Sequence, residues 1–240
     1  MKTPTEPRVA VVPAAQEPRQ RWRLTFARAA VVDGETPAGR DYISAWEAAL
    51  SESGLPIAMT DAGRVRFALG APLPARTAGE AELADIWLTE RWPAWRVREA
   101  LEHVLPAGHA LEALEDVWPG APALAGRVAA ADYRATLRGG IDPGAVSAAA
   151  GRLLAVDGLP RERAKGGSVK TYDLRPLLIS IEAAPEHQGL VVRMRTRIHP
   201  ELGSGRPEEV IAALGDELGA QLQTVATVRE RLVLSDDLER

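Results

Sequence analysis

The chain has 240 residues, of which 46% are hydrophobic and 26% charged, and its formal net charge at pH 7 is -4. This composition is typical of a globular protein with one large domain or two small ones, and the negative net charge excludes general binding of polyanions. The sequence contains no cysteine, which excludes disulfides, cysteine nucleophiles and iron–sulfur clusters held by cysteine.

The first 19 residues are polar and rich in proline, and Pro13 interrupts their one short apolar stretch. Because this pattern is atypical of a signal peptide, residues 1–19 are expected to form a flexible tail. Apolar runs elsewhere are much shorter than the ~20 residues that a membrane-spanning helix needs. We therefore predict a cytoplasmic protein without a membrane partner.

Residues 20–119 alternate between strand and helix patterns. A period of two places Trp22, Leu24 and Phe26 on one face of the first strand, and helical spacing places Trp46 on the apolar side of the next segment. Strands are expected at 21–30, 64–73, 82–90 and 109–119, and helices at 41–54 and 93–105. The order β-α-β-β-α-β is that of a ferredoxin-like unit. Of the tryptophans, Trp92 and Trp95 are expected to pack in the core or, alternatively, to form a partner surface.

Residues 131–235 repeat this order after a linker at 120–130, and a polar tail occupies 236–240. Strands are expected at 131–138, 168–184, 189–198 and 223–234, and helices at 142–156 and 206–219. The predicted fold class is α+β, with two tandem ferredoxin-like halves whose antiparallel sheets carry helices on one face. The two sheets could stand side by side as one large antiparallel sheet.

A basic loop at 161–170 contains two of the three lysines of the chain, Lys165 and Lys170, on either side of two glycines. Glycine lets the backbone approach an anion closely, so the loop is a candidate for binding phosphate or RNA. The spacing is not that of a phosphate-binding P-loop. The alternative is a solvated hairpin without a ligand.

Arg193, Arg195 and Arg197 recur with a period of two in one expected strand and therefore share a face. Guanidinium groups about 7 Å apart match the spacing of a phosphate backbone, which predicts a contact with RNA. The alternative is a solvated sheet face on which carboxylates such as Glu182 or Glu230 neutralise the arginines.

Asp173 and Arg175 lie in the segment KTYDLRP. A carboxylate held by an arginine is a candidate nucleophile or acid–base group, and the alternative is an ion pair that orients the turn. Arg206 precedes an expected helix whose N-terminus would favour an anion. The histidines lack the spacing of metal ligands, so neither a metal nor a cofactor is expected.

Several segments in order resemble the radical-SAM-linked proteins known as DUF2344. A helix that starts at Asp41 ends in GLP and leads to RFALGAPLP, and the segments LADIWLTE, AADYRATL, KTYDLRPLL and RPEEVIAAL follow. The resemblance covers residues 20–235. The chain departs from the family pattern at 61–63, where Asp-Ala-Gly replaces a GFNPHP-type loop, and before Asp41, where AGRD replaces SHLD. These departures imply a diverged member.

The resemblance implies a partner, a B12-binding radical-SAM protein, and a connection with RNA or ribosome metabolism. The first functional hypothesis is a non-catalytic accessory or binding protein that acts with this partner and binds RNA through the basic strand and loop. The second is an RNA-modifying enzyme, because paired ferredoxin-like halves resemble TruA-type tRNA pseudouridine synthases, in which one aspartate is catalytic. Asp173 would take that role, although the RTDxGVHA pattern of those enzymes is missing. The third is a protein-interaction module without a ligand.

Overall fold

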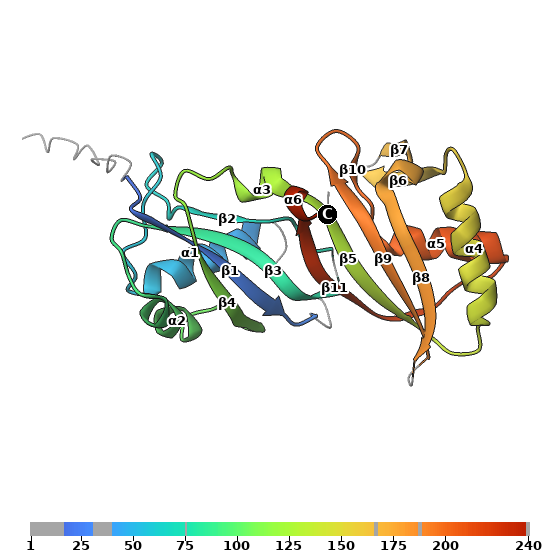
Figure 1. The fold of residues 1–240 in the computed structure, drawn as a ribbon, viewed down its shortest axis with the longest axis horizontal. Coiled ribbons are helices and arrows are strands. Elements are labelled where there is room, and N and C mark those ends of the chain that lie inside the picture. The colour runs from blue at the N-terminus through green and yellow to red at the C-terminus, as the bar shows by residue number, and fades with distance from the viewer. Residues whose placement is uncertain (1–16, 31–39, 75, 166–167, 187–188, 239–240) are drawn as a thin grey trace, which may run out of the picture.

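The computed structural model describes residues 17–30, 40–74, 76–165, 168–186 and 189–238. The protein is a mixed α+β structure in which one nine-stranded, mostly antiparallel sheet runs through the molecule (Figure 1). A separate two-stranded sheet accompanies it. Most of the tail expected at 1–19 lies outside the described residues.

The first half of the chain contributes four strands and two helices to this arrangement. Its elements are β1 (Gln20–Arg28), α1 (Arg40–Glu52), β2 (Phe67–Leu69), β3 (Thr77–Leu88), α2 (Ala94–Glu102) and β4 (His109–Val117). In the sheet the strands lie in the order β4-β1-β3-β2, and all neighbours are antiparallel.

The second half is longer, because a hairpin and several short elements are added. Its elements are α3 (Leu124–Arg127), β5 (Val128–Leu137), α4 (Pro143–Ala155), β6 (Pro160–Lys165), β7 (Ser168–Asp173), the 3-10 helix η1 (Arg175–Leu177), β8 (Leu178–Glu186), β9 (Gly189–His199), β10 (Gly203–Ser204), α5 (Pro207–Leu218), β11 (Thr224–Leu234) and α6 (Ser235–Leu238). The long strands lie in the order β8-β9-β5-β11, whereas β6 and β7 pair only with each other.

Local sequence explains where the helices of the second half begin and end. The Asp142 side chain accepts hydrogen bonds from the backbone N–H groups of Gly144 and Ala145, at 3.2 and 3.0 Å, and so caps the first turn of α4. Gly219 ends α5 in the left-handed conformation, with φ of 62°, which glycine adopts without strain.

The two halves meet where β3 and β11 pair in parallel, with Thr77, Ala78 and Gly79 opposite Thr227, Val228 and Arg229. The expectation of a wholly antiparallel sheet is therefore wrong at the junction. The strand expected at 64–73 is reduced to the three residues of β2, and β3 begins at Thr77 rather than at residue 82. Because β2 covers so little of the long β3, the start of β3 keeps a free edge that β11 fills.

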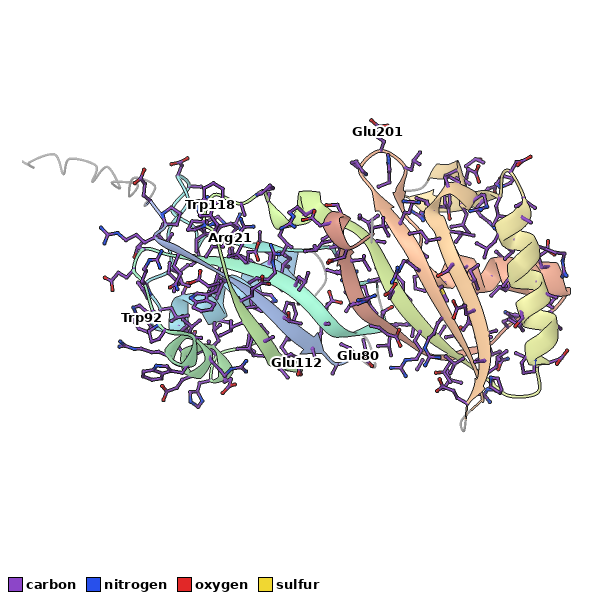
Figure 2. The ribbon with its side chains drawn as sticks, viewed as in Figure 1. Arg21, Glu80, Trp92, Glu112, Trp118 and Glu201 are labelled. Atoms are coloured by element: carbon purple, nitrogen blue, oxygen red, sulfur yellow. The ribbon has the colours of Figure 1, made fainter. Side chains whose placement is uncertain are left out.

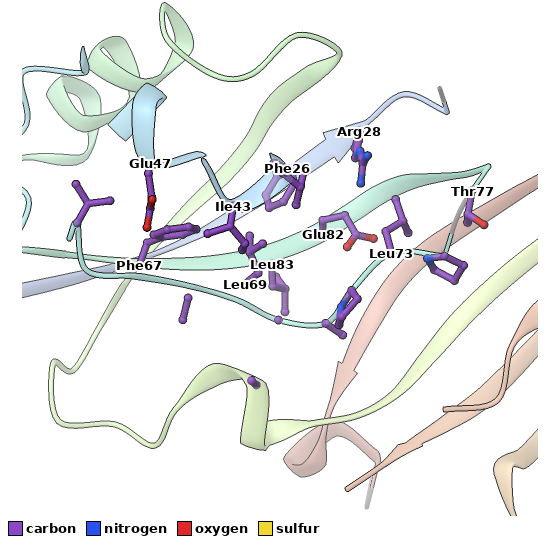
Figure 3. A pocket seen from close by; sticks show the side chains of 18 of the residues that line it. Phe26, Arg28, Ile43, Glu47, Phe67, Leu69, Leu73, Thr77, Glu82 and Leu83 are labelled. Atoms are coloured by element: carbon purple, nitrogen blue, oxygen red, sulfur yellow. The ribbon is translucent and has the colours of Figure 1, made fainter. Parts of the chain in front are cut away.

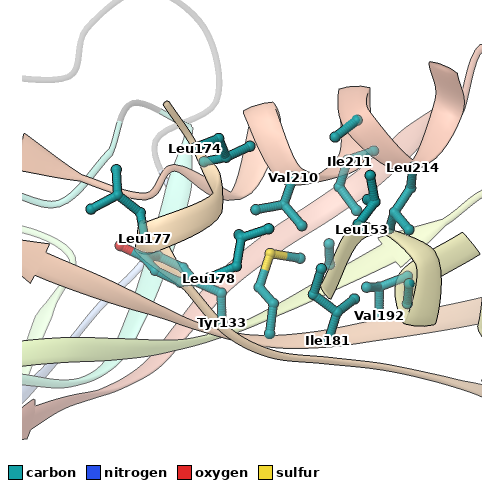
Figure 4. Packing of buried hydrophobic residues seen from close by; sticks show 14 of the residues in the cluster. Tyr133, Leu153, Leu174, Leu177, Leu178, Ile181, Val192, Val210, Ile211 and Leu214 are labelled. Carbon is teal, nitrogen blue, oxygen red and sulfur yellow. The ribbon is translucent and has the colours of Figure 1, made fainter. Parts of the chain in front are cut away.

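Each half has its own hydrophobic core between its sheet and its helices. In the first half Trp22, Leu24 and Phe26 pack with Trp46 of α1 and with α2. In the second half β5, β8 and β9 pack against α4 and α5 (Figure 4). Trp95, expected in a core, is 68% exposed, because it lies on the outer side of α2 in its first turn.

Candidate functional site

The arginine row predicted on β9 lies on the sheet face opposite the second core, and most of its charge is paired. Arg193 donates to Glu186 at 2.8 Å, and Arg195 donates to both oxygens of Asp132, at 2.6 and 2.9 Å. Arg197 is exposed and, within the described residues, has no carboxylate partner. The carboxylates leave this face with much less free positive charge than the sequence alone suggested.

Asp132 also accepts a hydrogen bond from Arg231, at 2.8 Å. Burial alone would raise the pKa of Asp132, but Arg195 and Arg231 together hold that pKa below its ordinary value. Glu230, named above as a neutralising residue, accepts a hydrogen bond from Arg134 at 2.9 Å and lies 3.8 Å from Arg193. The face is therefore an ion-pair network.

The basic loop is the hairpin of β6 and β7. Arg163 forms a two-point ion pair with Glu209 of α5, at 2.8 and 2.7 Å, and Arg161 pairs with Asp216 of the same helix. The side chains of Lys165 and Lys170 lie outside the described residues. Two of the basic groups of the loop thus attach the hairpin to α5.

Asp173 and Arg175 lie beside the end of α4, where both contact backbone groups. The Asp173 carboxylate accepts hydrogen bonds from the N–H groups of Leu159 and Arg175, at 2.7 and 2.9 Å. The Arg175 guanidinium donates to the carbonyl oxygens of Leu154, Val156 and Leu178. These contacts hold the turn that leads into β8, and they do not join the two side chains in an ion pair.

Arg206 is the residue before α5, and its guanidinium lies 3.8 Å from Glu208. The predicted site residues therefore occupy separate elements: β9, the hairpin of β6 and β7, η1, and the residue before α5. Among the described residues, no group of three or more histidine or acidic side chains is placed to hold a metal ion. No helix within those residues combines the length and apolar character needed to cross a membrane.

A pocket of about 930 Å³ lies in the first half and contains none of the predicted site residues. Its walls come from the end of β1, from α1, from the chain between residues 60 and 77, and from β3, and Ala125 of α3 adds to them (Figure 3). Most of the lining is apolar or aromatic, including Phe26, Ile43, Phe67, Leu69 and Leu83. The segment 61–63, in which the sequence departs from the DUF2344 pattern, contributes Ala62 to the lining, and Arg64 follows it.

The charged groups of the pocket lie towards its two ends. Glu47 lies near Phe67 at one end, where it pairs with Arg64. Arg28 and Glu82 lie near Thr77 at the other end (Figure 3). The apolar stretch between the ends is suited to the body of an organic molecule.

Arg28 is held over the ring of Tyr42, with 4.4 Å between the guanidinium carbon and the ring centre. The Tyr42 hydroxyl lies 3.0 Å from Nε2 of His109, whose Nδ1 lies 3.0 Å from the Pro106 carbonyl oxygen. A carbonyl oxygen only accepts, so Nδ1 carries a proton, and in the neutral form of the ring Nε2 accepts from the Tyr42 hydroxyl. Burial lowers the pKa of His109, and it raises the pKa of Tyr42.

Glu82 is 4% exposed and pairs with Arg229, which is 1% exposed. Arg229 also donates to the carbonyl oxygens of Ala71 and Pro72, both at 2.9 Å, so it fixes the pocket wall before β3. Burial alone would lower the pKa of Arg229, but the contact with Glu82 raises it. A Cβ at Gly79 would lie 2.6 Å from Cγ of Glu82, so glycine makes room for the pair.

Sequence reasoning missed this pocket because the segment RVRFALGAPL was interpreted as one strand. The signal that could have found it is Gly70 followed by Pro72 and Pro74, since proline cannot donate to a sheet and glycine weakens it. Outside the pocket, the same half carries an exposed tryptophan on its surface: the Trp118 side chain is 74% exposed (Figure 2).

The fold and the pocket define a protein of the α+β class with a cavity of ligand size. Residues 37–224 match the family model described as "Uncharacterized protein conserved in bacteria (DUF2344)", so the chain belongs to the DUF2344 family. The assignment to the DUF2344 family, drawn from the sequence motifs, is thereby confirmed.

Comparison with curated proteins gives no match. Among solved structures, a Cbf5-Nop10-Gar1 complex matches at 11% identity and a TM-score of 0.46, over 87% of this chain and 48% of that chain. This chain therefore spans about half the length of that structure. An unknown protein from Galdieria sulphuraria matches at 16% identity and a TM-score of 0.24, over 85% of this chain and 96% of that one.

Proposed function

We propose that the protein is a non-catalytic binding protein that holds a small organic molecule in the pocket beside α1 and β2. The observation that carries the proposal is a cavity of about 930 Å³ with a mainly apolar and aromatic lining. Ligand sites are typically apolar cavities of about 300–1,000 Å³ with a few polar groups. The lining carboxylates in the described residues, Glu47 and Glu82, are both paired with arginines, which favours binding over acid–base chemistry.

The pocket belongs, in this proposal, to the first of two tandem ferredoxin-like units. The supporting observation is that both halves have the same order of neighbouring strands. This order is β4-β1-β3-β2 in the first half and β11-β5-β9-β8 in the second. The second unit would then carry the hairpin of β6 and β7 as an insertion.

The partner in the proposal is the one that the family resemblance implies, a B12-binding radical-SAM protein. This chain would hold a molecule and the partner would supply the chemistry. An iron–sulfur cluster would belong to the partner, since this chain has no cysteine to hold one.

Binding of RNA by β9 and the hairpin is a second proposal. It is supported by Arg197, which is exposed and has no carboxylate partner in the described part of the chain. The paired state of Arg195 limits the strength of this surface.

The pocket can be tested with N-phenyl-1-naphthylamine, a neutral aromatic probe whose fluorescence rises in apolar surroundings. We expect saturable binding to the wild-type protein and at least about tenfold weaker binding to Ala68→Phe, which fills the cavity beside β2. Ala113→Phe is the matched control, because Ala113 is exposed on β4 and outside the lining. Absence of saturable binding, or equal loss in both variants, would refute the proposal.

A further inference from the structure

The proposed pocket is asymmetric in charge. At the end formed by Glu47, the arginine of the lining, Arg64, is already paired. At the other end Arg28 and Arg76 line the pocket, and neither has a carboxylate partner in the described residues. The carboxylate nearest to them in the lining, Glu82, is occupied by Arg229. Free positive charge therefore remains at one end.

Local geometry holds Arg28 in this position. Phe26 pairs with Glu82 and Arg28 pairs with Gly79, so β3 has one extra residue between these pairs. Such a bulge changes the direction of the neighbouring side chains. Phe26 and Arg28, on either side of it, both line the pocket. The stacking of Arg28 on Tyr42 leaves the edge of the guanidinium able to donate hydrogen bonds.

Arg76 has a backbone conformation that is unfavourable for a residue with a side chain. Its φ is 58°, and it is the one non-glycine residue with positive φ in the described part of the chain. Side chains with a Cβ rarely adopt this conformation, and where they do it is frequently at a ligand site. Arg76 lines the pocket and directly precedes Thr77, the first residue of β3, which lies at the same end of the pocket as Arg28 (Figure 3).

From these observations we infer that the ligand is an amphiphilic acid. Its apolar body would lie in the apolar stretch of the pocket, and its one carboxylate or phosphate group would lie between Arg28 and Arg76. The inference rests on the proposed function, because it names the ligand class of the same pocket. An arginine donates paired hydrogen bonds to either acid group, and such charge-assisted bonds are stronger than neutral ones. A neutral molecule would leave both guanidinium groups without a charged partner.

The test is displacement of N-phenyl-1-naphthylamine by four ligands that share a ten-carbon chain: decanoate, decyl phosphate, decanol and decylamine. We expect decanoate or decyl phosphate to bind at least about tenfold more tightly than decanol, with decylamine weakest. The better of the two acids identifies the head group. If decanol binds as tightly as both acids, the inference is overturned while the pocket stands. If the probe itself does not bind, the proposed function fails as well.

Single substitutions test which arginines cause the preference for an acid over decanol. We expect Arg28→Gln and Arg76→Gln each to bring decanoate and decanol to within about threefold of each other, while the neutral probe still binds. Arg64→Gln is the matched control, because Arg64 lines the same pocket but is paired with Glu47, and it should keep the preference. If Arg28→Gln no longer binds the probe, the inference is judged on Arg76→Gln. Arg76 is exposed, so its replacement should leave the fold intact. An unchanged preference in Arg76→Gln would then contradict the inference.

Discussion

Arg229 of β11 and Glu82 of β3 form a buried ion pair at the junction of the two halves, and the same arginine holds the carbonyl oxygens of Ala71 and Pro72 in the pocket wall. The pair therefore connects the packing of the second half to the shape of the pocket in the first. On the opposite side of the junction, Arg134 of β5 pairs with Glu80 in an exposed setting.

The buried pair is expected to stabilise the protein far more than the exposed one. Glu82→Gln leaves the Arg229 guanidinium buried without a counter-charge, and we expect it to lower the free energy of unfolding by about 3–5 kcal/mol. Glu80→Gln removes one of the two carboxylate partners of Arg134 at the surface, leaves Glu230 in place, and should cost less than about 1 kcal/mol. Urea denaturation of both variants measures the difference, and similar values would contradict the role given to Arg229.

Asp173 is expected to have a structural role. Asp173→Ala removes the acceptor for the N–H groups of Leu159 and Arg175 and should lower the free energy of unfolding by about 1–3 kcal/mol. Asp173→Asn keeps the oxygen that accepts both bonds and should remain near the wild type in stability. If Asp173 is instead a catalytic residue in RNA modification, Asp173→Asn abolishes a modification detectable by mass spectrometry of cellular RNA.

His109 is expected to make stability depend on pH in the mildly acidic range. Burial lowers its pKa in the folded protein below the ordinary value of 6.5, so the unfolded chain binds a proton first as the pH falls. The stabilisation by the neutral ring is complete above pH 6.5 and declines as the pH drops towards the folded pKa. His109→Gln should flatten the change in unfolding free energy between pH 7 and 5, whereas His103→Gln, at an exposed position, should not. Equal slopes in wild type and His109→Gln would count against this role.

Binding of RNA by β9 can be tested through its dependence on salt. If the face binds RNA, Arg197→Ala should reduce the slope of log affinity against log salt by about 1, the value for one lost phosphate contact. Arg195→Ala should change the slope less, because Arg195 is paired with Asp132. Wild-type protein that shows no salt-dependent binding to a single-stranded RNA would dismiss this second proposal.

The sequence by itself was sufficient to predict the family, the mixed α+β class, and the existence of most long elements. Alternation of apolar residues marked strands such as β1 and β9, and capping residues such as Asp142 marked helix starts, because these signals depend on neighbours along the chain. Only the tertiary structure decided which charges are free. Arg195 and Asp132 are 63 residues apart, and Arg229 and Glu82 are 147 apart, so their pairing cannot be deduced from local spacing. The pocket has the same origin: Arg28, Phe67 and Arg76 meet in it because strand pairing brings distant segments together around a chain that leaves the sheet after β2.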